Sequence, residues 1–341
     1  LGYCGMGCPV NAKQSMLVTT IPATLDKGGT LLYLARAERL IHDGDRVTGL
    51  ECLGMDERAV APNGRRIMVK ARHYVLAGGG INSPALLLRS QAPDPHERVG
   101  KRTFLHLVNF SAAQFEQVIN PFYGAPQSVY SDHFQWDDGT AGRMSYKLEV
   151  PPMQPALAAT LLGRFGVDNA LRMEQLPHTN VMLALMRDGF HPDSAEGSVE
   201  LRGDGTPVLD YRMTDYTWDG LRRAFHSMAE IQFAAGAKAV LPIHAAAEYV
   251  KSPAEARALI DRLELRLFQT RLGSAHVMGG CAMGEDAKSA VTDSLGRHHQ
   301  LENLSIHDGS LFPTSIGANP QLSIYGLTAK LATLLAERLK A

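Results

Sequence analysis

Two short apolar segments each end on glycine and lead into a helix, and this order limits the fold more than any other feature. Residues 73–77 read as a buried strand that runs into glycines at 78–80, and a helix is expected with Pro84 at its first position. Residues 304–308 read as a later strand, which a loop joins to a long apolar helix over 321–339. Strand, glycine turn and helix in this order are typical of an α/β fold.

The remaining elements follow from the spacing of apolar residues. Helices are expected over 14–28, 215–235 and 253–272, strands over 30–34, 46–53, 67–70, 180–186 and 197–201, and a turn at 62–64. From about residue 105 helices and strands mix irregularly, so residues 105–265 are expected to form an α+β domain inserted into the first one. This interpretation divides the chain into residues 1–104, 105–265 and 266–341.

The composition argues against several classes of protein. The chain has 341 residues, 34 of them basic and 35 acidic, so no concentrated basic face is expected and no nucleic-acid partner. No apolar run approaches the roughly 20 residues of a transmembrane helix, so no transmembrane segment is expected. The four cysteines are too few and too scattered for a disulfide scaffold, which makes a cytoplasmic location the expectation.

A carboxylate lies where the last predicted strand ends. Asp308 is followed by Gly309 and a loop that leads to the helix over 321–339. Nucleotides bind at such connections in α/β sheets, because backbone N–H groups at the start of a helix stabilise an anion. A solvated connection would have the same pattern, so these residues alone leave both interpretations open.

His276 is the candidate for proton chemistry. A lone histidine is more often structural, but small residues follow this one at 279, 280, 282 and 284. Small residues permit close approach of the backbone, as a site that faces a flat cofactor requires. An imidazole also titrates near neutral pH, so it can hold or accept a proton under working conditions.

Taken together, these segments resemble the glucose–methanol–choline (GMC) family of flavoprotein oxidoreductases, in particular its bacterial, cholesterol-oxidase-like branch. The motifs that carry the resemblance are His276 with Gly279, Gly280 and Gly284; Asp308-Gly309-Ser310 with Pro313; Asn319-Pro320; residues 4–15 from Cys4 to Ser15; and residues 78–90. The last of these departs from the family pattern, because Gly80 stands where Ser, Thr or Ala is usual and Gln91 replaces a glycine. The range 105–265 carries little of the resemblance.

The resemblance implies an FAD-binding (Rossmann-like) domain, incomplete at its N-terminus, with an inserted substrate domain. It implies FAD-dependent oxidation of an alcohol CH–OH group, with the hydride passing to flavin N5. His276 would act as the general base, and Asn319 would orient the substrate oxygen. The residues expected to contact FAD are Ala37, Gly79, Ser83, Asp308, Gly309, Asn319 and Pro320. No metal site is expected.

The chain lacks the GxGxxG phosphate loop with which members of the family begin, and it opens on Leu1 without an initiator methionine. A missing N-terminal segment of the same enzyme is therefore expected to complete the site. Two alternatives stay open, namely a non-redox lyase of the hydroxynitrile-lyase kind and one part, inactive alone, of a split flavoenzyme.

Several features stay undecided in the sequence. The alcohol and the electron acceptor, oxygen or a redox partner, cannot be read from any motif. Cys4 and Cys8 could belong to an iron–sulfur site, but buried structural thiols are favoured. Glu149 could be an extra acid or base in the substrate pocket, although a surface carboxylate is favoured.

Overall fold

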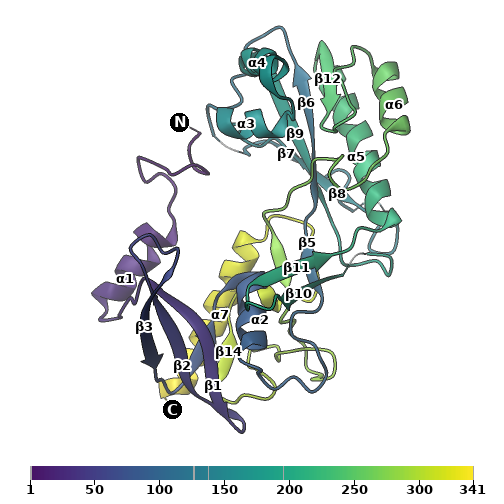
Figure 1. The fold of residues 1–341 in the computed structure, drawn as a ribbon. Helices are drawn as coiled ribbons and strands as arrows, with labels where there is room; N and C mark the ends of the chain where they lie inside the picture. The colour runs from purple at the N-terminus through teal and green to yellow at the C-terminus, as the bar shows by residue number, and fades with distance from the viewer. Residues whose placement is uncertain (1, 126, 137, 195, 341) are drawn as a thin grey trace. The chain divides into compact units, whose positions relative to one another are not determined.

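The chain passes back and forth between two units in the computed structural model, which describes residues 2–125, 127–136, 138–194 and 196–340. Unit 1 comprises Leu1–Thr30, Leu107–Arg187 and Thr214–Ser274, and unit 2 comprises Leu31–His106, Asp188–Met213 and Ala275–Ala341. Unit 2 therefore combines a purple-to-blue segment, a segment from the middle of the colour bar and the yellow C-terminal segment (Figure 1). Residues 188–213, expected in the inserted domain, pack in unit 2 instead.

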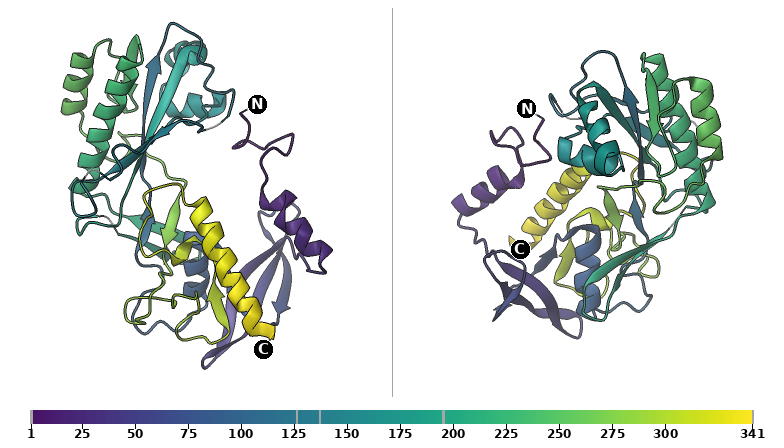
Figure 2. Two further views of the ribbon diagram at one scale, coloured as in Figure 1. Left: turned by 180° about the vertical axis from the view of Figure 1, so that it is seen from behind. Right: turned by 45° about the horizontal axis from the view of Figure 1, so that its top comes forward.

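The two strand–glycine–helix segments lie side by side in unit 2. Strand β4 (Tyr74–Leu76) pairs in parallel with β14 (Leu304–Ile306), so both strands end at the same edge. Helix α2 (Gly79–Arg89) follows β4, while η3 (Gly309–Leu311) and α7 (Gln321–Lys340) follow β14 (Figures 1 and 2). Leu304 and Ile306 are fully buried. The predicted strands and the final helix are present.

The start of α2 differs from the prediction. The helix begins at Gly79, so Pro84 lies inside it and not at its first position. Proline has no N–H, so the hydrogen bond from Pro84 to the carbonyl of Gly80 cannot form. Gly79 has φ +77, which L side chains rarely adopt, and this glycine turns the chain from the strand into the helix.

An antiparallel sheet precedes the parallel pair in unit 2. Its strands are β1 (Ala35–Asp43), β2 (Arg46–Met55) and β3 (Pro62–Val69), in that order. The strand predicted over 30–34 is wrong, because these residues lie outside any strand and Leu34 has φ +52, which extended backbone does not adopt. The turn predicted at 62–64 is wrong too, since β3 begins at Pro62.

A third sheet of unit 2 joins segments that are distant in sequence. Its order is β11 (Pro207–Tyr211), β10 (Gly197–Leu201), β5 (Thr103–Leu105) and β13 (Val277–Gly279). The pairing of β10 with β5 is what brings residues 188–213 into unit 2. In the pairing of β13 with β5, Val277 lies opposite Leu105 and Gly279 opposite Thr103. This register places residue 276 beside residue 106.

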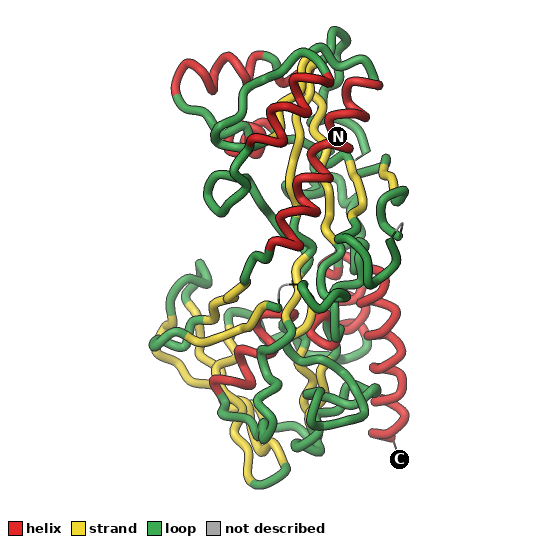
Figure 3. The backbone as a smooth tube through the Cα atoms, turned by 90° about the vertical axis from the view of Figure 1, so that its right-hand side faces the viewer, coloured by secondary structure: helices red, strands yellow, loops and turns green. Residues whose placement is uncertain are grey.

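Unit 1 is an antiparallel sheet with helices. The sheet order is β12 (Ala239–Pro242), β6 (Val108–Gln114), β9 (Thr179–Met186), β8 (Tyr146–Glu149) and β7 (Tyr130–Ser131). Helix α5 (Asp215–Ala234) runs along this sheet (Figures 1 and 3). It buries Leu221, Ala224, Phe225 and Met228 at the predicted helical spacing. The remaining helices of unit 1 are η1 (Met16–Val18), α1 (Thr20–Asp26), α3 (Pro155–Leu161), α4 (Gly166–Glu174), η2 (Leu176–His178) and α6 (Pro253–Arg262).

Two helices of unit 1 are shorter than predicted. The segment expected as a helix over 14–28 is split into η1 and α1, and neither buries a residue. The helix predicted over 253–272 ends at Arg262. Its last carbonyls accept hydrogen bonds from the Arg222 guanidinium, which also reaches the carbonyl of Leu263 at 2.8 Å and so ends the helix. Across the described ranges, no helix combines the length and apolarity needed to cross a membrane.

Candidate active site

His276 lies immediately before β13 and contacts His106, which lies immediately after β5. The backbone N–H of His106 donates to the carbonyl of His276 at 3.4 Å, and the two Nδ1 atoms are 3.0 Å apart. The rings meet edge to face at 87° with centroids 5.1 Å apart. His106 is fully buried, whereas His276 is half-buried. His276 is therefore the more accessible member of a histidine pair.

The loop that carries Asn319 is connected to this pair. The backbone N–H of Gly317 donates to Nε2 of His106 at 3.0 Å. Ser315 Oγ donates to the carbonyl of Asp188, which is a further anchor of the loop within unit 2. Asn319 follows two residues after Gly317 and is exposed. His106 thus joins His276 to the Asn319 loop, and the catalytic roles of His276 and Asn319 stay predictions.

No pattern in the sequence pointed to His106. It lies 170 positions before His276 and is surrounded by ordinary strand residues. The register of β5 against β13 brings the two imidazoles together, and no local spacing reports that register.

Close backbone contacts explain the small residues after His276. Gly279 has φ +83, and a Cβ added there would lie 1.9 Å from the carbonyl oxygen of Arg102. A Cβ on Gly80 would lie 2.9 Å from the carbonyl oxygen of Val277. The glycines therefore let β13, β5 and α2 pack closely, so their presence does not by itself indicate a cofactor.

Asp308 joins the ends of the two parallel strands. Its Oδ2 accepts from the backbone N–H of Gly79 at 2.9 Å and from Ser83 Oγ at 2.5 Å. Its Oδ1 accepts from the N–H and the hydroxyl of Ser310 at 2.8 and 2.5 Å. Asp308, Gly79 and Ser83, three of the residues expected near FAD, therefore lie together. The carboxylate of Asp308 holds the surrounding backbone in place through these hydrogen bonds.

Replacing Asp308 with asparagine is expected to lower the free energy of unfolding by about 1–3 kcal/mol. Both carboxylate oxygens accept from donors, so an amide in either orientation would point its N–H₂ group at another donor. Urea denaturation measures the loss. The matched control is Asp286→Asn, because Asp286 is exposed and an asparagine there can still accept from the N–H of Lys288. Equal effects of the two substitutions would contradict this role of Asp308.

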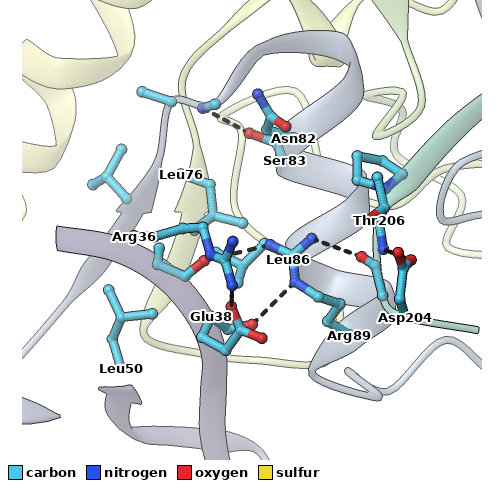
Figure 4. Close-up of a pocket in the computed structure, with 16 residues that line it drawn as sticks. Arg36, Glu38, Leu50, Leu76, Asn82, Ser83, Leu86, Arg89, Asp204 and Thr206 are labelled. Atoms are coloured by element: carbon cyan, nitrogen blue, oxygen red, sulfur yellow. Dashed lines mark hydrogen bonds and ion pairs between the residues drawn. The ribbon is translucent and has the colours of Figure 1, made fainter. Parts of the chain in front are cut away.

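A cavity of about 510 Å³ opens beside this edge of the parallel strands (Figure 4). Its walls come from β1, β4, α2 and the turn between β10 and β11, and they include Ala37, Gly78 and Ser83. Arg89 donates from one wall to the carbonyls of Glu38 at 3.1 Å and Ala37 at 3.4 Å. The volume lies within the roughly 300–1,000 Å³ of small-molecule sites.

These residues fit the nucleotide part of FAD. The cavity borders the glycine turn after β4, and its other walls combine polar groups with apolar side chains such as Leu50 and Leu86. Glycine turns between a parallel strand and a helix are where α/β sheets hold nucleotide phosphates. Ala37 and Ser83, which the resemblance predicts to contact FAD, line this cavity, and Gly79 adjoins it through Gly78. Their contact with FAD stays a prediction.

Glu149 and the two N-terminal cysteines lie in unit 1. The expectation of a surface carboxylate is wrong, because Glu149 is 3% exposed, with Lys147 Nζ at 3.2 Å and Gln127 Nε2 at 2.9 Å. Cys4 and Cys8 are half-exposed free thiols, so the favoured interpretation as buried thiols is wrong as well. Among the described residues, no group of three or more His, Cys, Asp or Glu side chains could hold a metal ion.

Profiles of one protein family match both ends of the chain. They describe the GMC oxidoreductases and match residues 1–108 and 192–328. An uncharacterized GMC-type oxidoreductase of Mycobacterium tuberculosis is 27% identical over 330 residues, which cover 96% of this chain and 49% of the relative. A long-chain-alcohol oxidase of Arabidopsis thaliana is 26% identical over 362 residues, covering 99% of this chain and 47% of the relative.

Solved structures show the same fold. Pyridoxine 4-oxidase from Mesorbium loti has a TM-score of 0.62 at 19% identity, over 96% of this chain and 61% of its own. A formate oxidase has a TM-score of 0.63 at 14% identity, over 90% of this chain and 60% of its own. The chain spans about half the length of the two relatives named above. The similar structures support the expected fold class, an α/β FAD-binding domain with a substrate domain.

Proposed function

The chain belongs to the GMC oxidoreductase family, and we propose that it carries the reacting end of an FAD-dependent enzyme that oxidises an alcohol to an aldehyde or a ketone. FAD is the cofactor that this family implies. The observation that carries the proposal is the half-buried imidazole of His276, held by β13 and by His106 in the part of the chain that matches the family.

The proposed reaction removes two hydrogens from the alcohol, the hydroxyl proton and a hydride from the carbon. FAD, when bound, supplies the acceptor for the hydride. His276 would contact the alcohol oxygen, where the sequence predicts a general base, and Asn319 would hold that oxygen through its side-chain amide. Positioning of this kind stabilises the transition state because the reacting groups start in the required orientation.

Two sets of residues would hold FAD. Ala37, Gly79 and Ser83, at the cavity beside β4, would contact its nucleotide part. The second set, at the end of β14 and the start of α7, would contact the flavin side and comprises Asp308, Gly309, Asn319 and Pro320. Asp308 would act mainly through the backbone it fixes, because its oxygens already accept four hydrogen bonds. The remaining contacts to FAD would come from the partner segment that the sequence analysis expects.

Under anaerobic conditions, adding an alcohol to the FAD-loaded protein is expected to bleach the flavin absorbance. Long-chain alcohols and pyridoxine are the first candidates, because similar proteins are named for them. Readmitting oxygen then separates an oxidase, whose flavin colour returns, from an enzyme that needs another acceptor. Cleavage of a cyanohydrin while every alcohol leaves the flavin oxidised would contradict the proposal and favour the lyase.

A further inference from the structure

The buried imidazole of His106 lies between His276 and the loop that carries Asn319. We propose that His106 is a positioning residue that fixes the tautomer of His276, so that His276 presents Nε2–H to the substrate as a hydrogen-bond donor. The part of this inference that concerns the substrate rests on the proposed alcohol oxidation. The tautomer itself follows from two hydrogen bonds of unit 2 and can be measured independently.

The first bond fixes the protonation of His106. Nε2 of His106 lies 3.0 Å from the backbone nitrogen of Gly317. A backbone N–H can only donate, so Nε2 must accept and cannot carry a proton. A neutral imidazole has one proton, which must then be on Nδ1 of His106. Burial and, to a smaller extent, His276 lower the pKa of His106 to about 3, which agrees with a neutral ring.

The second bond passes this constraint to His276. The Nδ1 atoms of His106 and His276 are 3.0 Å apart, so one of them must donate to the other. Because Nδ1 of His106 carries the proton, Nδ1 of His276 must accept. A neutral His276 then carries its own proton on Nε2.

The opposite arrangement would leave two donors facing each other. If Nδ1 of His276 carried the proton, His106 would accept at Nδ1 and would need its proton on Nε2. That proton would point at the N–H of Gly317 across 3.0 Å. A buried N–H that faces another N–H destabilises the folded chain, because it has lost its hydrogen bond to water and gains none in return. A doubly protonated His276 meets a similar conflict, because its Nδ1–H would face the Nδ1–H of His106.

The chemical role assigned here differs from the general base that the sequence predicts. A base needs a lone pair directed at the substrate, and the Nε2–H tautomer offers a proton at that position. The hydroxyl proton would pass to a water molecule in the site, and His276 would donate to the alcohol oxygen and stabilise the negative charge that this leaves on it, as preorganised donors do in other active sites. The amide of Asn319 can donate to the same oxygen, so both residues would act in the same way.

Nitrogen NMR of the FAD-loaded protein, with ¹⁵N-labelled histidine, tests the tautomer without any activity. Resonances of His276 are identified by their loss in a His276→Gln sample. We expect Nδ1 of His276 to have the shift of an unprotonated nitrogen and Nε2 that of a protonated one. A protonated Nδ1 on neutral His276 would overturn the inference. If no alcohol reduces the flavin, the proposed function fails, yet this measurement still decides the tautomer.

Two isosteric variants of His106 test its positioning role. In His106→Asn the amide nitrogen takes the place of Nδ1 and can still donate to His276. In His106→Gln the amide takes the place of Nε2, and the donor to His276 is lost. We expect the Gln variant to lower kcat roughly 10- to 100-fold, the range seen when a metal-binding histidine loses the partner that orients it, with a smaller change in KM. The Asn variant should lose clearly less kcat than the Gln variant, because it keeps the donor to His276 although His106 Nε2 no longer accepts from the N–H of Gly317.

A purely structural role would affect the Asn and Gln variants alike, and equal kcat values for the two would overturn the positioning role. The donor role has its own test at position 276. Glutamine there keeps an N–H near the position of Nε2 but cannot act as a base. His276→Gln is expected to retain at least about tenfold more activity than His276→Ala, since one preorganised donor contributes about 10²–10³ in kcat. Equal losses would overturn the donor role.

Discussion

Replacing His276 with alanine is expected to slow the reduction of bound flavin by an alcohol about 10²–10⁴-fold. The imidazole lies immediately before β13, half-buried and held by His106, so its removal takes away the proposed preorganised contact to the alcohol oxygen. Stopped-flow absorbance under anaerobic conditions measures this step directly. The content of bound FAD should stay unchanged, because the residues proposed to hold the nucleotide lie at the cavity beside β4.

A matched control distinguishes the loss of a reacting group from the loss of any histidine. His226 lies in unit 1, where its Nε2 is 2.9 Å from Asp261 Oδ1, and no role in the reaction is proposed for it. His226→Ala is expected to reduce flavin at the native rate. An unchanged rate in His276→Ala, with FAD bound, would remove His276 from the proposed mechanism.

Replacing Gly279 with alanine is expected to lower the free energy of unfolding by roughly 3 kcal/mol or more. The new Cβ would lie 1.9 Å from the carbonyl oxygen of Arg102, and the backbone would have to keep φ +83. Relief requires β13 and β5 to separate, which would also disturb the contact between His106 and His276. Urea denaturation of both forms measures the change, and flavin reduction should fall with it.

Gly236→Ala isolates the contribution of the backbone angle. Gly236 has φ +94, and its added Cβ would meet nothing within 4 Å. This control is expected to cost about 1–2 kcal/mol, the cost of a left-handed conformation alone. If Gly279→Ala cost no more than Gly236→Ala, the close approach to Arg102 would not be what requires glycine at position 279.

Regular elements with strong local patterns were predictable. Helix α5 shows apolar residues at helical spacing throughout, and strand β10 matches its predicted range. The errors arose where tertiary contacts override local preference. The apolar pattern continues beyond Arg262, but the Arg222 side chain binds the carbonyls there and α6 ends. At α2 the helix starts five residues before Pro84, because Asp308, far away in sequence, holds the N–H of Gly79.

The site was predictable to the extent that its chemistry is encoded in short motifs. His276 and Asn319 stand in such motifs, and so do Asp308 and Gly309. His106 was missed because its importance comes from strand register, a property of two segments that lie 170 positions apart. The buried state of Glu149 was missed for a similar reason, since the ion pair with Lys147 and the hydrogen bond from Gln127 form only in the folded chain.

The pairing of β5 with β13 also bears on how this protein can change during evolution. The chain first leaves unit 2 after His106, passes through it again over Asp188–Met213 and returns to it for the last time at Ala275, so the first departure and the last return occur at neighbouring positions of one strand pair. Doubling the length of the chain that connects two positions held side by side costs only about 0.6 kcal/mol of loop-closure entropy. Insertions and deletions between them therefore need not alter the register that sets the histidine pair. Substrate preference could diverge in the intervening residues while the reacting groups are inherited unchanged.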